Sequence, residues 1–221
     1  MTQLNWLFEL YRYSTGKKIV MALTGLIGVG YVIGHMLGNL QAFRGPSKLN
    51  AYASFLRSTG VLLWAVRVML LGAVLLHSLA AYQLARLSLK GRGVGYYRWQ
   101  PVASTYASRT MRWTGPTLGL FILFHVLHLT TGTVHPDFQQ GNVYANVVTA
   151  FRVWYVSAFY IIAMLALGLH LYHGVWSMFQ SLGINHPQYN RLIRGVAIFF
   201  TVIVVSGFIA IPVGVIIGIV S

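Results

Sequence analysis

The spacing of charged residues constrains the fold of this chain more than any other feature. Five stretches of at least 18 residues contain no Asp, Glu, Lys or Arg: 19–43, 68–85, 113–136, 153–190 and 195–221. A helix needs about 20 apolar residues to cross the hydrocarbon core of a bilayer. We therefore expect an all-α integral membrane protein, a five-helix bundle formed by one domain, 1–221. The expected helices lie near 19–41, 61–86, 113–133, 154–180 and 195–219.

Composition excludes the other broad classes of protein. Glu9 and Asp137 are the only acidic residues, against 16 Lys and Arg, and charged residues make up only 8% of the chain. A soluble domain needs a mixed charged surface that this chain cannot make, and 57% hydrophobic residues exclude intrinsic disorder. The basic residues do not cluster on a polar domain, so no nucleic-acid partner is expected. Cysteine is absent, which excludes disulfides and thiolate metal sites.

The distribution of Lys and Arg predicts the orientation of the bundle. With five spans, the N-terminus and the connections after the second and fourth helices lie on one side. Eleven of the 16 basic residues fall there: Arg12, Lys17, Lys18, Arg86, Lys90, Arg92, Arg98, Arg109, Arg112, Arg191 and Arg194. Because basic residues collect on the cytoplasmic side of membrane proteins, we expect the N-terminus inside and the C-terminus outside.

Two outer connections are candidates for short surface helices. After Pro46, the residues Leu49, Tyr52 and Phe55 have helical apolar spacing, and 144–151 is a weaker case. Such helices would act as lids over the outer end of the bundle. Loops resting among the lipid headgroups are the alternative.

Histidine is the residue type that points to function. Six of the eight lie in expected spans: His35, His77, His125, His128, His170 and His173. The other two, His135 and His186, precede prolines in expected loops and are interpreted as ordinary loop residues. An ionisable residue inside a membrane is costly and indicates function, although a single one more often only hydrogen-bonds a neighbouring helix.

The chemistry that suits these histidines is haem binding. Zinc-transport sites and proton relays usually add carboxylates, and no expected span contains one. Haem fits because its iron takes axial imidazoles and its macrocycle is apolar, so a bundle core can hold it between facing helices. Four helices that each supply one histidine would hold two six-coordinate haems.

Depth along each helix predicts which histidines pair. At 1.5 Å per residue, His35 lies about 26 Å from the inner side and His125 about 20 Å. His77 lies about 14 Å from the inner side, and His170 lies about 27 Å from the outer side. We therefore expect His35 to pair with His125 toward the outside, and His77 with His170 toward the inside.

An internal repeat bears on the choice of ligand in the third helix. Thr24-Gly25 precedes His35, and Thr114-Gly115 precedes His125, in each case by ten residues counted from the glycine. Matched positions in a repeat should do matched work, which favours His125 over His128. Depth alone favours His128.

In the fourth helix the residues leave the choice open. Gly174 follows His170 by one turn, and Ser177 follows His173 in the same way. A small residue at this spacing leaves room for a flat macrocycle. His128 and His173 are secondary candidates, for contacts with haem propionates or a quinone, or for hydrogen bonds between helices.

Three segments resemble a known family. GKKIVMALTG (16–25), HMLGNLQAF (35–43) and HLYHGVWSMFQSLG (170–183) look like the dihaem cytochrome b membrane anchor of bacterial succinate:quinone oxidoreductases (succinate dehydrogenase/fumarate reductase), the type with a single five-helix polypeptide. The resemblance covers almost the whole chain. It implies that His35 and His125 are the axial ligands of a distal haem, and that His77 and His170 are those of a proximal haem.

The resemblance also implies partners and a place in the cell. Such anchors lie in the bacterial cytoplasmic membrane and carry two haems b and a quinone site. They dock a flavoprotein subunit, which oxidises succinate at FAD, and an iron–sulfur subunit, so electrons pass from succinate to a quinone, expected to be menaquinone. Some members use a membrane-embedded glutamate. No expected span here contains a carboxylate, so a carboxylate proton path is not expected.

A quinone site is expected at the inner end of the bundle, beside the proximal haem. The candidate residues are Ser14, Lys17, Tyr82, Arg86, Ser108, Arg109 and Trp176. The alternative is the outer end, beneath the loop with Arg44 and Arg57.

Two other functions compete with this assignment. One is the cytochrome b subunit of a hydrogenase or formate dehydrogenase, against which the three segments argue. The other is a haem-free, histidine-containing transporter, which predicts a colourless purified protein.

Overall fold

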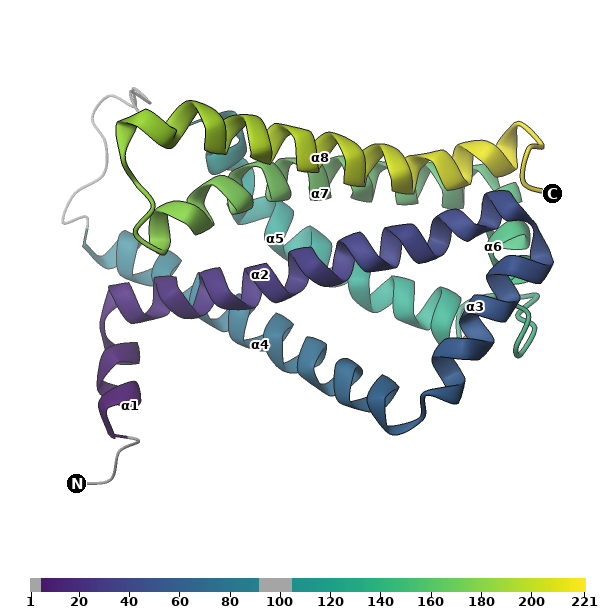
Figure 1. Ribbon diagram of the computed structural model, residues 1–221, viewed down its shortest axis with the longest axis horizontal. Coiled ribbons are helices and arrows are strands. Elements are labelled where there is room, and N and C mark those ends of the chain that lie inside the picture. The colour runs from purple at the N-terminus through teal and green to yellow at the C-terminus, as the bar shows by residue number, and fades with distance from the viewer. Residues whose placement is uncertain (1–4, 92–104) are drawn as a thin grey trace.

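The computed structural model describes residues 5–91 and 105–221, and within these ranges it contains helices and connecting segments but no strand (Figure 1). The helices are α1 (Asn5–Arg12), α2 (Ser14–Asn39), η1 (Leu40–Arg44), α3 (Pro46–Ser58), α4 (Val61–Lys90), α5 (Tyr106–His125), η2 (Val126–Thr130), α6 (Val143–Arg152), α7 (Trp154–Ser181) and α8 (Pro187–Ile216).

Four segments are long and apolar enough to cross a membrane: Ser14–Arg44, Val61–Lys90, Trp154–Ser181 and Pro187–Ile216. Most of their side chains are not buried inside the protein, so the apolar surface faces outward, as it does where lipid is the solvent. The helical part of the expected fold is therefore confirmed. The fifth expected span, 113–133, corresponds to α5 and η2, which contain Pro116, two histidines and four threonines and are therefore less hydrophobic. Its crossing of the membrane stays a prediction.

The helix ends differ from the expected ones mainly because charged residues do not end a helix. α8 begins at Pro187 rather than near 195, since Pro187 occupies the first turn and His186 caps it by accepting a hydrogen bond from Gln188 N–H. α5 begins at Tyr106 rather than near 113, where Thr105 accepts from Ser108 N–H at 3.1 Å. Such polar first turns lie where a membrane helix leaves the hydrocarbon core.

Four of the long helices form a bundle with an open side. α2 packs against α4 and α7, and α7 packs against α5, whereas α4 and α5 make no extensive contact among the described residues. Going round the bundle, the order is therefore α4, α2, α7, α5. α8 lies outside this group against α7 and α2, and Figure 1 shows α4 diverging from α2 toward α3.

Small residues allow the close approach of α8. A Cβ on Gly168 of α7 would lie 3.1 Å from Val205 Cγ2 of α8. Met36, Leu171 and Val204 form a buried cluster where α2, α7 and α8 meet. The packing there depends on shape, because lipid provides no hydrophobic drive for helices to associate.

Both expected surface helices are confirmed, as α3 and α6, at the end of the molecule opposite α1 (Figure 1). α6 is mostly buried, with Val147, Val148 and Phe151 in the largest core cluster. Asn50 joins the two helices, since its Nδ2–H donates to Asn142 Oδ1 at 2.9 Å and its Oδ1 accepts from Tyr144 N–H at 3.0 Å. The two helices therefore form a fixed cap over this end, which we call the outer cap because the sequence predicts that this end lies outside.

Gly38 is expected to be essential to the contact between α2 and the outer cap. A Cβ there would lie 2.6 Å from Tyr52 Cε1 of α3. Gly38→Ala should destabilise the protein by about 1–3 kcal/mol, because the ring or α3 must shift. Thermal denaturation in detergent measures this. Gly30→Ala is the control, since a Cβ at Gly30 meets no atom within 4 Å. If both variants melt alike, Gly38 does not position α3.

Candidate functional site

Two pairs of histidines meet inside the bundle. The rings of His35 (α2) and His125 (α5) have centroids 5.7 Å apart at an interplanar angle of 80°. The rings of His77 (α4) and His170 (α7) have centroids 6.2 Å apart at 55°. These are the two pairs expected from depth, and the structure brings both together.

Both pairs bridge the bundle diagonally. In the order α4, α2, α7, α5, the first pair joins α2 to α5 and the second joins α4 to α7, which are opposite helices. The helices that share a histidine pair make no extensive backbone contact among the described residues. The imidazoles therefore reach into the centre of the bundle from opposite sides, the place where bundles hold cofactors and metals.

The spacing within each pair fits two axial ligands of one metal ion. Imidazole nitrogen binds a metal ion at about 2 Å, so two rings on opposite sides of the ion have centroids roughly 6 Å apart. A zinc site needs three or four protein ligands, but no three of His, Asp and Glu gather within 5–91 and 105–221. Isolated pairs suit a haem iron, whose four remaining ligands come from the macrocycle.

The space beside the histidines is consistent with a planar group. A Cβ built at Gly28, two turns before His35, or at Gly174, one turn after His170, meets no atom within 4 Å. Both glycines are half-buried, so they lie within the protein rather than on its outermost surface. The residues present therefore fit a haem, in ligand type, spacing and room.

The hydrogen bonds of His77 fix its tautomer. Its Nδ1 lies 3.1 Å from the backbone oxygen of Met21, which can only accept, so Nδ1 carries the proton and donates. The lone pair of Nε2 is then free to bind a metal ion. A backbone carbonyl in this role is the usual partner of a metal-binding histidine.

His128 is turned away from His35 by a change in the helix. In η2 the turn widens, and Thr131 N–H donates to Val126 O, five residues back, at 2.9 Å. His128 is buried, stacks on His135 at 5.0 Å, and places Nδ1 3.0 Å from the hydroxyl of Tyr160. It faces the outer cap, whereas His125 faces His35.

His135 is not the ordinary loop residue that its position before Pro136 suggested. Its side chain is buried, Nε2 donates to Asn146 O at 3.0 Å, and Nδ1 accepts from Asp137 N–H at 3.2 Å. The signal missed in the sequence was Asn146 in α6, a buried polar residue that holds the loop to the outer cap. His186, by contrast, lies at the surface and caps α8.

His173 lies near the inner end of α7, away from the His77–His170 pair. It packs beside Trp176, whose ring carries the Arg194 guanidinium at 5.3 Å. With Thr105 and Tyr172 these residues line a void of about 10 Å³, close to the lower limit for one water molecule.

The expected quinone residues have different surroundings in the structure, and a quinone site among them stays a prediction. Lys17 is buried and donates to Tyr11 O at 2.7 Å and Arg12 O at 2.9 Å, so it holds α1 against α2. Tyr82 is exposed and accepts from Arg86 at 3.2 Å. The other four candidates are on three helices. Ser14 starts α2, Ser108 and Arg109 lie in the first turn of α5, and Trp176 is on α7.

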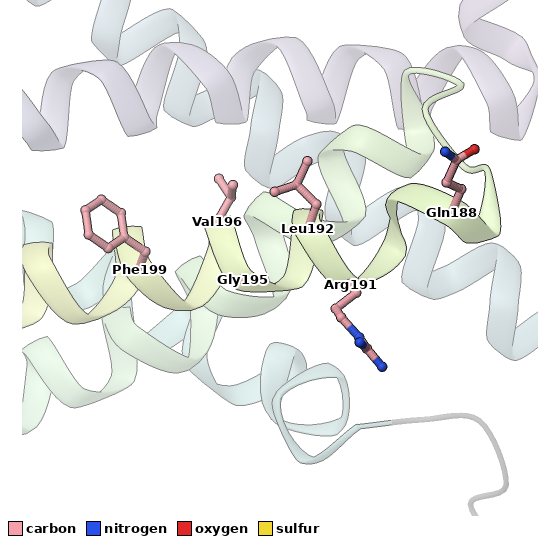
Figure 2. A pocket seen from close by; sticks show the side chains of 6 residues that line it. All are labelled: Gln188, Arg191, Leu192, Gly195, Val196 and Phe199. Atoms are coloured by element: carbon pink, nitrogen blue, oxygen red, sulfur yellow. The ribbon is translucent and has the colours of Figure 1, made fainter.

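A hollow of about 580 Å³ lies away from the histidines. Figure 2 shows that its six lining residues all belong to α8: Gln188, Arg191, Leu192, Gly195, Val196 and Phe199. A hollow lined by one helix is open on its other sides, and Leu192 and Phe199 are largely exposed. We interpret it as lipid-facing surface, because exposed apolar side chains line it.

Comparisons with known proteins identify the family of the chain. The family described as the succinate dehydrogenase/fumarate reductase transmembrane subunit matches residues 90–209, from the end of α4 into α8. No curated protein and no solved structure matches the chain. The matched residues make up more than half of the sequence, and the chain therefore belongs to the succinate dehydrogenase/fumarate reductase transmembrane subunit family.

Proposed function

We propose that this chain is the cytochrome b membrane anchor of a succinate:quinone oxidoreductase, with two haems b, and that the complex reduces a quinone with electrons from succinate. The observation that carries the proposal is the two diagonal histidine pairs, with ring centroids 5.7 and 6.2 Å apart. Bound haem would supply one-electron chemistry, because its iron alternates between ferric and ferrous states. His35 and His125 would hold the outer haem, and His77 and His170 the inner one.

The protein's own residues support this role by orienting the imidazoles. Nδ1–H of His77 donates to Met21 O, and the hydroxyl of Tyr160 lies 3.4 Å from Nδ1 of His125. When Nδ1 of a histidine is engaged in this way, Nε2 remains the metal-binding nitrogen. None of the described long helices contains Asp or Glu, so no carboxylate competes for the imidazoles there.

The catalytic partners follow from the family. Succinate oxidation would take place at FAD on a flavoprotein subunit, and an iron–sulfur subunit would pass electrons to this chain. The chain has no cysteine to hold a cluster of its own. We place the complex in the bacterial cytoplasmic membrane, with five spans, the N-terminus inside, and menaquinone as the acceptor.

Loss of one ligand from a pair should remove mainly one haem. His35→Ala or His125→Ala should halve the haem content by loss of the outer haem, and His77→Ala or His170→Ala by loss of the inner one. The reason is that six-coordinate haem needs both axial imidazoles. Pyridine haemochrome quantitation and a redox titration of the purified complex measure this. An unchanged titration of His35→Ala would refute the pairing, and a colourless wild-type protein would refute the haem itself.

His128 should not be required for haem binding. His128→Gln is expected to retain both haems, because His125 rather than His128 faces His35. The variant should still be less stable, by about 1–3 kcal/mol, because the Tyr160 hydroxyl loses its shorter hydrogen bond, at 3.0 Å, and keeps only the 3.4 Å contact with His125 Nδ1. The two measurements are haem content and thermal denaturation. Selective loss of the outer haem would instead make His128 the ligand.

The proposed orientation can be tested by labelling, since the chain has no cysteine. Ser58→Cys at the end of α3 should react with a membrane-impermeant maleimide in spheroplasts. Lys90→Cys at the end of α4 should react only after the membrane is permeabilised. The two positions lie on exposed surface at opposite ends of α4, so each is the control for the other. The reverse pattern would invert the topology.

A further inference from the structure

The internal repeat in the sequence corresponds to a repeated contact in the structure, between a threonine and a histidine. Each copy consists of Thr-Gly followed ten residues later by a histidine of the outer pair. In the structure, the threonine of each copy contacts a histidine of the inner pair, on the next long helix of the same half. Thr24 of α2 lies against His77 of α4, and Thr114 of α5 lies against His170 of α7.

The first contact has well-defined donors and acceptors. Thr24 Oγ1–H donates to Val20 O at 2.7 Å, which leaves the lone pairs of the hydroxyl oxygen pointing elsewhere. His77 Nδ1 lies 3.2 Å from that oxygen and 3.1 Å from Met21 O. Since Met21 O forces the proton onto Nδ1, this N–H is shared between the carbonyl and the hydroxyl.

The second contact, between Thr114 and His170, resembles the first but has no backbone carbonyl beside the histidine in the described structure. Thr114 Oγ1 lies 3.5 Å from His170 Nδ1, at the long end of the range for a hydrogen bond, and its hydroxyl is directed to Met111 Sδ at 3.9 Å. Thr114 is buried, as is Thr24. No backbone carbonyl comparable to Met21 O contacts His170 Nδ1 among the described residues.

We propose that Thr24 and Thr114 are matched positioning residues that fix the imidazoles of the inner pair. Each hydroxyl oxygen accepts from Nδ1–H, holds the ring in one orientation, and leaves Nε2 directed to the bundle centre. The inference rests on the proposed function in one respect, namely that the group bound at Nε2 is a haem. The chain is thus built of two equivalent halves, α2–α4 and α5–α7, and each half supplies one ligand and its support to the inner site and one ligand to the outer site.

The two threonines should differ in importance. Replacing Thr24 leaves Met21 O to hold His77, whereas replacing Thr114 leaves His170 Nδ1 without an acceptor in the described structure. Partners of this kind typically change metal affinity by about 10–100-fold when removed. Thr114→Val should therefore weaken haem retention at the inner pair by roughly tenfold, and Thr24→Val should have a smaller effect.

The test compares Thr24→Val and Thr114→Val with the matching serine variants, which keep the hydroxyl. Thr117→Val on the outward face of α5 is the control for the loss of a threonine, since its side chain is exposed. In the purified complex, haem retention and the midpoint potential of each haem are measured. Thr114→Val should raise the inner midpoint, because an imidazole that loses its acceptor donates less electron density to a ferric ion. Thr114→Ser should restore it.

A second readout does not depend on haem. ¹⁵N-histidine spectra of the full chain in nanodiscs, reduced if haem is bound, report whether each Nδ1–H is protected from exchange. Thr114→Val should remove the protection of His170, and Thr24→Val should leave much of that of His77. If wild type binds no haem, this result still decides the role of the threonines, while the proposed function fails.

Two outcomes would overturn the inference. One is that both valine variants keep the wild-type haem retention, midpoint potential and Nδ1–H protection. The other is that Thr114→Val loses haem with Nδ1–H protection intact and Thr114→Ser does not recover it, which would assign Thr114 to packing alone.

Discussion

The arrangement of this protein depends on how imidazoles are satisfied in a membrane interior that lacks carboxylates. The only two acidic residues, Glu9 and Asp137, lie in α1 and in an outer loop. Inside the bundle, histidine nitrogens contact a backbone oxygen or a hydroxyl: Met21 O and Thr24 for His77, Thr114 for His170, and Tyr160 for His125 and His128. Unpaired polar groups are costly in such surroundings, so these contacts limit where each helix can lie.

This requirement is consistent with the two kinds of contact in the bundle: adjacent helices pack directly, and opposite helices are bridged by histidine pairs. Adjacent helices pack closely where small residues allow it, as Gly168 does beneath Val205. Within the described residues, opposite helices make no extensive backbone contact, and the histidine pairs bridge them. A cofactor between each pair would complete the contacts across the centre. The family and the long apolar helices identify a membrane subunit, and the diagonal histidine pairs are what support the proposal that it carries redox groups.

The end of the molecule opposite α1 is closed by the outer cap. α6 lies in the main core cluster, and Tyr144 Oη–H donates to Ser221 O at 3.1 Å, which attaches the C-terminus to the outer cap. His128 and His135 stack beneath it. The outer histidine pair is therefore separated from the outer surface by a layer of buried side chains with defined hydrogen bonds.

The sequence by itself predicted the helical class, the two short helices of the outer cap and the family, because these follow from the spacing of charges, from apolar periodicity and from local motifs. It also predicted five membrane-spanning helices, of which four have the required length and hydropathy in the structure. It also supplied the depths at which His35, His77, His125 and His170 lie, since rise per residue is constant in a helix. It placed the starts of α5 and α8 too late, because caps such as Thr105 and His186, rather than charges, begin those helices.

Tertiary structure decided everything that depends on rotation about a helix axis and on contact between distant segments. It turned His128 away from His35 through the widened turn of η2, and it buried His135 against Asn146. It directed Lys17 to the backbone oxygens of Tyr11 and Arg12, and it left Tyr82 exposed beside Arg86. It also brought the repeated threonines to the inner histidines rather than to the outer ones that follow them in sequence. A repeat fixes spacing along one helix, whereas the partner of a side chain is chosen by the neighbouring helix that packs against it.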